Sequence, residues 1–307
     1  MAVKVITDST SCIPKDLAEK YGVEIVSLSV IMNGESYKEV DIDSEAFYDE
    51  LAKCDKLPTS SQPPMDEFYN AFEKFAKDGH DIVAAFISSK LSGTYTTSHI
   101  IKDMILEKYP DVKFVTIDFE PQKDGSGETK VGDNTVSYLF SEQESGYVAG
   151  YAAVKEGYTK LGFMGGMALP AVENYGVGYL QGASDAAKEM NVNVDVNYTY
   201  TGTFSESPDI KSKASSWYAG GTEVIFSCGG QICNSIFAAG QEAGKYTIGV
   251  DIDQSGESDT VITSALKDVK GATIEALNAY KKDKFQGGKT VTLKNTGGIV
   301  YPGLLKN

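Results

Sequence analysis

The sequence lacks the features that direct a chain into a membrane or out of the cell. Its first residues show no basic segment followed by an apolar stretch, so no signal peptide or lipoprotein signal is expected. No apolar run approaches the ~20 residues that a membrane-spanning helix needs. Four cysteines are too few and too scattered for a disulfide framework and are expected to be free thiols. These absences predict a cytoplasmic protein with no membrane insertion.

Basic residues are scarce relative to acidic ones. The 307 residues include 28 Lys and Arg against 43 Asp and Glu, which gives a formal net charge of -15. Such a surface repels phosphate backbones and anionic headgroups, so neither nucleic acid nor a membrane surface is an expected partner. Hydrophobic residues, at 41%, are sufficient for two cores, and the length predicts two domains.

Residues that enzymes commonly use are equally scarce. The two histidines, His80 and His99, belong to no metal-binding pattern and are expected to be solvated or capping side chains. The chain contains no GxSxG elbow, no P-loop and no strand-linked GxGxxG. Gly176, Gly178 and Gly182 miss that last motif by one residue and fall in a helical pattern, where they predict close helix packing. We therefore expect no enzyme, no metal and no cofactor.

Strand and helix patterns alternate along most of the chain. Continuous apolar runs such as 82–87 are typical of strands buried on both faces of a parallel sheet, and helices such as 232–243 separate them. This alternation predicts an α/β fold with mostly parallel sheets in three-layer lobes. We expect a first lobe at 1–140, with a long loop at 119–134. The second lobe is expected at 141–307, with the chain end returning to the hinge.

Two local patterns in the first lobe carry further predictions. Residues 23–30 are rich in β-branched side chains and predict a single strand, which the Asn33-Gly34 turn joins to another in a hairpin. Ser44 precedes an apolar pattern of helical spacing and is expected to cap that helix.

Hydroxyl-rich segments flank the strands expected in the first lobe. They are Asp8, Ser9 and Thr10 after the first strand, Thr59, Ser60 and Ser61 before a helix, and Ser92, Gly93 and Thr94 in the segment 88–94. We expect the three segments to meet at one sheet edge, where open α/β sheets bind ligands. Hydroxyls and helix N-terminal amides suit a carboxylate or a phosphate. Alternatively, these residues are the N-caps and turn formers that any α/β protein needs.

Ordered motifs in the first third of the chain follow the pattern of a known family. They are Lys4-Val5-Ile6-Thr7-Asp8-Ser9-Thr10, the Asn33-Gly34 hairpin, Asp41-Ile42 with Phe47-Tyr48, Pro58–Pro63 and Leu91-Ser92-Gly93-Thr94-Tyr95. Over about residues 1–105 the chain thereby resembles the DegV family. The resemblance implies fatty-acid binding, with the acyl carboxylate held by Ser60, with Thr59 and Ser61 beside it, and by Ser92 with the Gly93 amide.

The remainder of the chain follows the pattern of another family. Its motifs are 138–144, 146–153, 161–167, Val224-Ile225-Phe226 with Gly229-Gly230, 249–254 and 263–267. From about residue 107 to 305 the chain resembles the basic membrane protein family of transporter substrate-binding lipoproteins, many of which bind nucleosides. The resemblance implies that Asp251 and Lys267 hold ribose hydroxyls and that Gly229, Gly230 and Phe226 line the site. It also implies parents that are exported lipoproteins.

Each resemblance covers only part of its family. The second lobe of DegV proteins has no counterpart here, and the first strand and Asp-x-x-Phe-Asn-type motif of the other family are replaced. The chain therefore looks like a chimera joined within 99–118, with two Rossmann-like lobes of the periplasmic-binding-protein type.

Three functions remain open on these grounds. The leading one is non-catalytic binding of a nucleoside-like solute between two lobes. The alternatives are a cytosolic fatty-acid carrier of the DegV type and a folded chimera with no functional ligand site. In the first two the partner is a small molecule, and the sequence identifies no transporter or kinase partner of the kind used by the parent families.

Overall fold

A computed structural model describes residues 3–54, 56–87, 92–118, 131–294 and 299–300. Most of the loop expected at 119–134 and residues 88–91 of the third hydroxyl-rich segment lie outside these ranges.

The chain divides into two units and passes between them three times. Unit 1 comprises Met1–Tyr138 and Ala276–Val291, and unit 2 comprises Leu139–Glu275 and Thr292–Asn307. The sequence-based division at residue 140 differs from this, because it assigns 276–291 to the second lobe.

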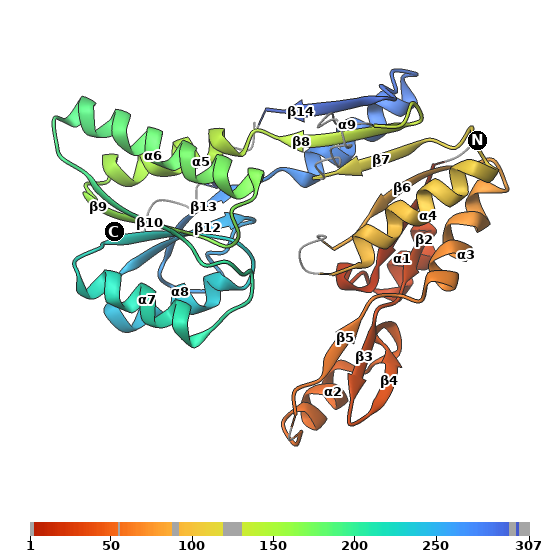
Figure 1. Ribbon diagram of the computed structural model, residues 1–307, viewed down its shortest axis with the longest axis horizontal. Coiled ribbons are helices and arrows are strands. Elements are labelled where there is room, and N and C mark those ends of the chain that lie inside the picture. Colours follow the sequence, from red (N-terminus) through yellow and green to blue (C-terminus); the bar gives the residue numbers. More distant parts are fainter. Residues whose placement is uncertain (1–2, 55, 88–91, 119–130, 295–298, 301–307) are drawn as a thin grey trace. The chain divides into compact units, whose positions relative to one another are not determined.

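A six-stranded sheet forms the centre of unit 1, in the order β14-β8-β7-β6-β1-β2 (Figure 1). The strands are β1 (Val3–Asp8), β2 (Val23–Val26), β6 (Asp81–Ala85), β7 (Phe114–Ile117), β8 (Thr135–Phe140) and β14 (Lys289–Leu293). Strand β1 pairs in parallel with both β2 and β6, and parallel pairing continues through β7 to β8. The carboxyl end of β1 is therefore a topological switch point. Strand β14 lies beside β8, which explains why 276–291 belongs to this unit.

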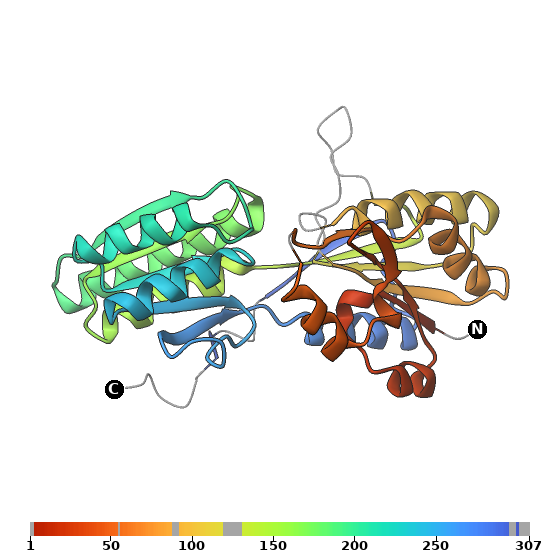
Figure 2. The same cartoon turned by 90° about the horizontal axis from the view of Figure 1, so that it is seen from below.

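Two helices, α3 (Met65–Ala76) and α4 (Thr94–Lys108), cover one face of this sheet. The apolar residues of α3 are buried there and pack with Ile6, Phe114 and Ile101 in one core cluster. Figure 2 shows α1 (Lys15–Tyr21) and α9 (Val269–Lys281) on the opposite side of the sheet. Unit 1 is thus a three-layer α/β structure, as the sequence predicts.

A small antiparallel sheet, in the order β4-β3-β5, extends from unit 1. Strand β3 (Ser29–Met32) pairs with β4 (Glu35–Lys38) and with β5 (Thr59–Ser61), and α2 (Ser44–Leu51) belongs to the same stretch. The hairpin turn is confirmed, with positive φ at both Asn33 and Gly34 (54° and 85°).

Two local predictions for this region are wrong. The run 23–30 is not one strand, because the Ser9 hydroxyl accepts a hydrogen bond from the Leu28 N–H (3.0 Å) between β2 and β3. Helix α2 is capped by Asp43 and not by Ser44, since the Asp43 carboxylate accepts the Ala46 N–H (2.9 Å).

Unit 2 is built on a second six-stranded sheet, in the order β10-β9-β11-β12-β13-β15. The strands are β9 (Lys160–Gly165), β10 (Asp195–Tyr200), β11 (Val224–Cys228), β12 (Tyr246–Asp251), β13 (Val261–Leu266) and β15 (Ile299–Val300). All pairs are parallel except β13 with β15. Because β10 and β11 flank β9, the carboxyl ends of β9 and β11 form the switch point of this sheet.

Helices cover both faces of the unit 2 sheet. Helices α5 (Glu142–Lys155) and α6 (Pro170–Met190) share one core cluster, and α7 (Pro208–Ala219) and α8 (Ile232–Ala243) share another. The bounds of α8 are those predicted from the sequence. The α/β fold class with mostly parallel sheets is therefore confirmed for both units.

Helices α5 and α6 touch backbone to backbone. A methyl group on Gly178 or Gly182 would lie 2.1 or 1.9 Å from a carbonyl oxygen of α5, and one on Gly146 or Gly150 would lie 2.2 or 2.0 Å from a carbonyl oxygen of α6. At Gly176 a methyl group would lie 2.1 Å from a tyrosine hydroxyl of β10. The predicted close helix packing is confirmed at Gly178 and Gly182, whereas Gly176 packs against the sheet.

We expect Gly182→Ala to lower the free energy of unfolding by about 1–3 kcal/mol, because the added methyl group forces the two helices apart. In a helix interior without such a contact, alanine stabilises by about 0.5–1 kcal/mol relative to glycine. A decrease in the free energy of unfolding therefore indicates a steric clash between the helices. Trp217 on α7 is the only tryptophan, and its fluorescence in a urea titration reports on unit 2. The control is Gly256→Ala, where an added methyl group meets nothing within 4 Å. An unchanged midpoint for Gly182→Ala would contradict the close packing.

Candidate functional site

At the carboxyl edge of the unit 1 sheet, Asp8 joins the first hydroxyl-rich segment to the residues that follow β6. The buried Asp8 carboxylate accepts hydrogen bonds from the N–H (3.1 Å) and hydroxyl (2.5 Å) of Thr10, and from the N–H of Ile87 (2.8 Å). Since Ile87 follows β6, this carboxylate ties the ends of two neighbouring strands together. Both of its oxygens are engaged in holding the turn.

Ser9 is also buried and links this edge to the small sheet. Its hydroxyl donates to Glu39 Oε2 (2.5 Å) and accepts from the N–H of Leu28. The structure therefore shows Asp8, Ser9 and Thr10 holding the backbone at the switch point.

The second and third segments meet through Gln62. A methyl group on Gly93 would lie 2.2 Å from Gln62 Oε1, so the loop after β5 touches the turn before α4. In that turn the Ser92 and Thr94 hydroxyl oxygens are 2.9 Å apart, and Thr94 is fully buried. On β5, by contrast, Thr59, Ser60 and Ser61 are all exposed.

His99 is not the solvated side chain expected from the sequence. It lies on α4 with its Nε2 2.5 Å from the hydroxyl oxygen of Tyr95. Burial, with the charge of Lys102 nearby, lowers the pKa of His99 to about 4, and burial raises the pKa of Tyr95. His99 is therefore neutral at pH 7.

The carboxyl ends of β12 and β13 in unit 2 bring together three charged side chains, the charged cluster. Lys267 Nζ lies 3.8 Å from Asp251 Oδ1 and 3.5 Å from Oε1 of Glu142, the first residue of α5. The side chains of Lys267 and Glu142 are each 6% exposed, whereas that of Asp251 is 51% exposed. Asp251 and Lys267 are thus neighbours, and Glu142 is a partner that the sequence analysis missed.

Aromatic and amide groups support the charged cluster. The Tyr175 hydroxyl donates to Asp251 Oδ1 (3.2 Å), and the Asn174 amide donates to Glu142 Oε2 (3.2 Å). The Lys267 ammonium lies 5.8 Å from the centroid of the Tyr175 ring, within cation–π range. Burial, together with the charge of Asp251, raises the pKa of Tyr175, so its hydroxyl remains a donor at neutral pH.

The backbone of Asp251 is left-handed, with φ at 66°. Residues other than glycine rarely adopt this conformation. When they do, the backbone strain is commonly found at binding and catalytic sites. The Lys267 N–H donates to the Asp251 carbonyl (2.9 Å), so β13 holds the strained residue in place. The half-exposed carboxylate is fixed at the strand end.

Two aromatic residues of unit 2 differ in their relation to this edge. Phe226, expected to line the site, is fully buried in the core against Phe163 and Tyr179. Phe204, missed from the sequence, is partly exposed and lies over the glycines that follow β9 and β11. A methyl group on Gly166 would lie 2.3 Å from Phe204 Cδ1, and one on Gly229 would lie 2.9 Å from it.

Gly229 and Gly230 lie at the switch point of the unit 2 sheet. Both have positive φ (152° and 55°) and form the turn from β11 into α8.

The signal that could have identified Phe204 is its position as the single apolar side chain in the stretch 201–207, which is otherwise Thr, Gly, Ser and Glu.

Neither a metal-ligand cluster nor a membrane-spanning helix is found in the part of the chain that the structure describes. No group of three or more His, Cys, Asp or Glu there could hold a metal ion. None of the helices in those ranges is both long and apolar enough to cross a bilayer.

Comparison with known proteins divides the chain between two families. Residues 2–121 match the DegV family model. A DegV domain-containing protein of Clostridium perfringens is 98% identical over 118 residues, which cover 38% of this chain and 42% of that protein. The match extends further than the boundary near residue 105 that the motifs indicate, because the last helix and strand of the segment carry no distinctive motif.

The second similarity is to solute-binding proteins. The ABC transporter nucleoside-binding protein BmpA of Lactococcus lactis is 32% identical over 185 residues, 53% of this chain and 52% of that protein. Basic membrane protein A1 of Borrelia garinii is 31% identical over 218 residues, 69% of this chain and 61% of that protein. The chain spans about half the length of the curated relatives it matches. Both resemblances predicted from the motifs are confirmed, and the chain combines segments similar to two families.

A solved structure shows the fold of the chain as a whole. An ABC transporter solute-binding protein from Aeropyrum pernix aligns with 98% of this chain and 76% of its own, with a TM-score of 0.61 and 21% identity. The fold is therefore of the periplasmic-binding-protein type, as expected.

We expect Lys267→Met to lower the free energy of unfolding by about 3–5 kcal/mol, because it leaves the buried Glu142 carboxylate without its cation. Urea titrations followed by Trp217 fluorescence measure this change. The control is Lys211→Met, which removes an exposed pair with Glu242 and should alter stability by no more than about 1 kcal/mol. Equal effects of the two substitutions would show that the charged cluster does not depend on Lys267.

Proposed function

We propose that unit 2 binds the sugar hydroxyls of a nucleoside-like solute and catalyses no reaction on it. The observation that carries the proposal is the half-exposed Asp251 carboxylate beside the buried Lys267 ammonium. The carboxylate accepts a hydrogen bond from one hydroxyl and the ammonium donates to its neighbour, so the pair suits a vicinal diol. With Glu142 the cluster carries two negative charges and one positive charge, which favours a neutral ligand over an anion.

Phe204 supports a ligand that also has a planar ring. Its partly exposed ring lies at the carboxyl edge of the same sheet, over glycines whose lack of a side chain leaves room for it. A nucleobase stacks on such a ring, and stacking of this kind contributes about 1–3 kcal/mol per base. A sugar diol and a base together define a nucleoside.

The relatives give this proposal independent support. The Lactococcus lactis protein is named as nucleoside-binding, and the chain is 32% identical to it over about half of its length. That similarity includes the part of the chain that folds as unit 2, because 53% of the chain is more than the 138 residues that precede unit 2.

Titration calorimetry with ribonucleosides and their 2′-deoxy analogues tests the proposal. We expect the ribonucleosides to bind more tightly than the deoxy forms, because only they carry a vicinal diol. Asp251→Asn should weaken binding by about tenfold or more, since a hydrogen bond to a charged group is worth about 1.5–3 kcal/mol. Asp253→Asn removes the same charge from an exposed side chain two residues away and should bind as the unmodified chain does. No heat change with any nucleoside at millimolar concentration would contradict the proposal.

A fatty-acid site in unit 1 is the second candidate. The exposed hydroxyls of β5 precede the loop that touches the turn before α4, within the segment that is 98% identical to a DegV domain-containing protein. Ser60 and Ser92 would hydrogen-bond the carboxylate of the lipid.

Native mass spectrometry separates the two candidates by the mass of the bound molecule. A fatty-acid site predicts an adduct of fatty-acid mass on the purified chain, lost in Ser60→Ala/Ser92→Ala and retained in Asp251→Asn. A chain that carries no adduct and takes up none from added fatty acid would exclude the second candidate. A chain that binds neither lipid nor nucleoside would be a folded chimera without a ligand.

A further inference from the structure

Strand β10 forms one edge of the unit 2 sheet and pairs with β9. The N–H of Asp195 donates to Thr159 (2.9 Å) and that of Thr201 donates to Gly165 (2.8 Å), so the odd-numbered residues face β9. Because backbone direction alternates along a strand, the N–H and carbonyl groups of Val196 and Tyr198 point away from the sheet. These groups form a donor and acceptor row that another strand can complete.

The edge lacks three of the usual protections against pairing, which are lysine, proline and a bulge. Strand β10 reads Asp-Val-Asn-Tyr-Thr-Tyr, with no proline and no lysine, and its register with β9 runs without a bulge. Sheet edges that remain single commonly carry one of these features. Their absence over six residues makes β10 competent to accept a partner strand.

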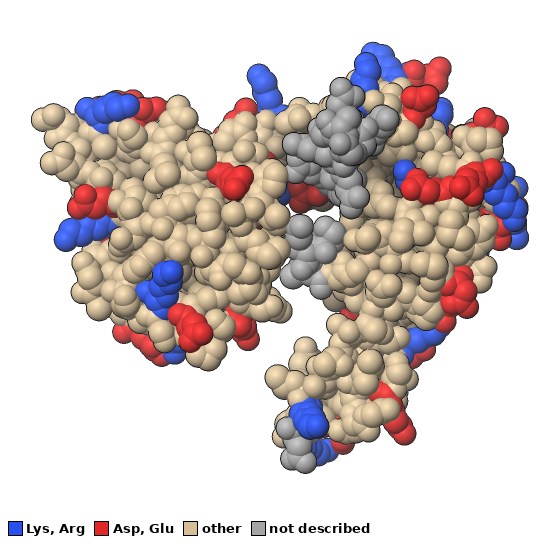
Figure 3. Space-filling model, in the orientation of Figure 1, with Lys and Arg blue, Asp and Glu red and all other residues tan. Residues whose placement is uncertain are grey.

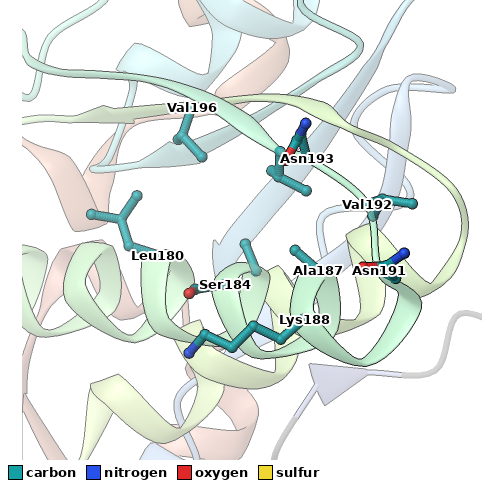
Figure 4. Close-up of a pocket in the computed structure, with 10 residues that line it drawn as sticks. Leu180, Ser184, Ala187, Lys188, Asn191, Val192, Asn193 and Val196 are labelled. Carbon is teal, nitrogen blue, oxygen red and sulfur yellow. The ribbon is translucent and has the colours of Figure 1, made fainter.

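A groove lined by both apolar and polar side chains runs beside this edge, between β10 and α6. It has a volume of about 330 Å³, and Figure 4 shows Leu180 and Ser184 of α6 facing Val196 of β10 across it. Val177 and Leu180, one helical turn apart on α6, are 59% and 37% exposed. A strand added to β10 would bring a second helix alongside these side chains and cover them.

Charges on the face of β10 that is turned towards α7 determine which strand can pair with it. Lys213 of α7 donates from Nζ to Thr199 Oγ1 (3.2 Å), so an ammonium lies over one end of β10. Asp195 is exposed at the opposite end and on the same face, because its side chain and that of Thr199 are four residues apart. The strand therefore carries opposite charges at its two ends and is complementary to an antiparallel copy of itself.

We propose that β10 pairs antiparallel with β10 of a second copy of this chain about a two-fold axis at Asn197. Val196 then forms the hydrogen-bonded pair with Tyr198 of the partner subunit, because both point their backbone groups outward. Asp195 lies opposite Thr199 of the partner subunit, within reach of Lys213 of the partner subunit. An axis at Tyr198 would also satisfy the backbone, but it would place Asp195 opposite Thr201 of the partner subunit, away from that ammonium.

Cross-linking at the axis tests the register. In a chain with Cys12 and Cys54 replaced by serine, Asn197→Cys should give a disulfide-linked dimer on mild oxidation. Residue 197 faces its own copy in a non-hydrogen-bonded pair, in which the two Cα atoms lie about 4.5 Å apart. Asp195→Cys is the matched control. Two copies of residue 195 would be separated by about 13 Å along the strands and should not cross-link. Cross-linking of both variants at the same rate, or of neither, overturns the proposal.

Sedimentation equilibrium tests the association itself and the role of the charges. The unmodified chain should form dimers in the micromolar range. Asp195→Lys and Lys213→Glu should each raise the dissociation constant at least tenfold, and the double variant should restore it, because the swapped charges again face each other. Trp217 fluorescence confirms that each variant is folded. A chain that stays monomeric at 200 µM, or a double variant weaker than both single ones, overturns the proposal.

Discussion

The ion pairing of the buried Lys267 ammonium with Glu142 and Asp251 is the interaction on which the carboxyl edge of the unit 2 sheet depends. The ammonium stands between a carboxylate at the start of α5 and another at the end of β12, so one cation holds a helix and two strands together. All 28 basic residues of the chain are lysines. A lysine ammonium has three donors on a flexible stem and no fixed planar geometry, so it can approach both carboxylates.

The sheets of the two units share a winding order. Both sheets begin in the middle and extend outward, so each unit presents the ends of its first strands at a switch point. The family matches together exceed the length of the chain, and they therefore overlap within 2–121. Within unit 1 the Lys113 ammonium lies 5.5 and 5.4 Å from the ring centroids of Tyr280 and Phe285, so the later segment packs directly on the DegV-like one.

Local patterns in the sequence predict local structure well and long-range contacts poorly. Helix α8 and the Asn33-Gly34 turn are predicted correctly, because their signals lie within a few residues. Strand β13 is missed, because Thr263 and Ser264 interrupt its apolar run although both are buried. Asp251 and Lys267 are recognisable by motif, but Glu142 is more than a hundred residues away and meets them only through the order of strands. Phe204 is missed for the same reason, because the glycines that it covers, Gly166 and Gly229, follow two other strands.

The discontinuous units have a consequence for how the chain reaches its fold during synthesis. Unit 1 receives its edge strand β14 only from residues 289–293, after all of unit 2 except β15 has been made. The ribosome therefore releases strand β8 paired with β7 on one side only, and its other edge stays unpaired while more than a hundred residues are added. Unit 2, by contrast, can assemble its five consecutive strands as they emerge. Residues 289–293 thus complete the unit 1 sheet late in synthesis. A chain truncated before them would keep an open sheet edge in the unit that was made first.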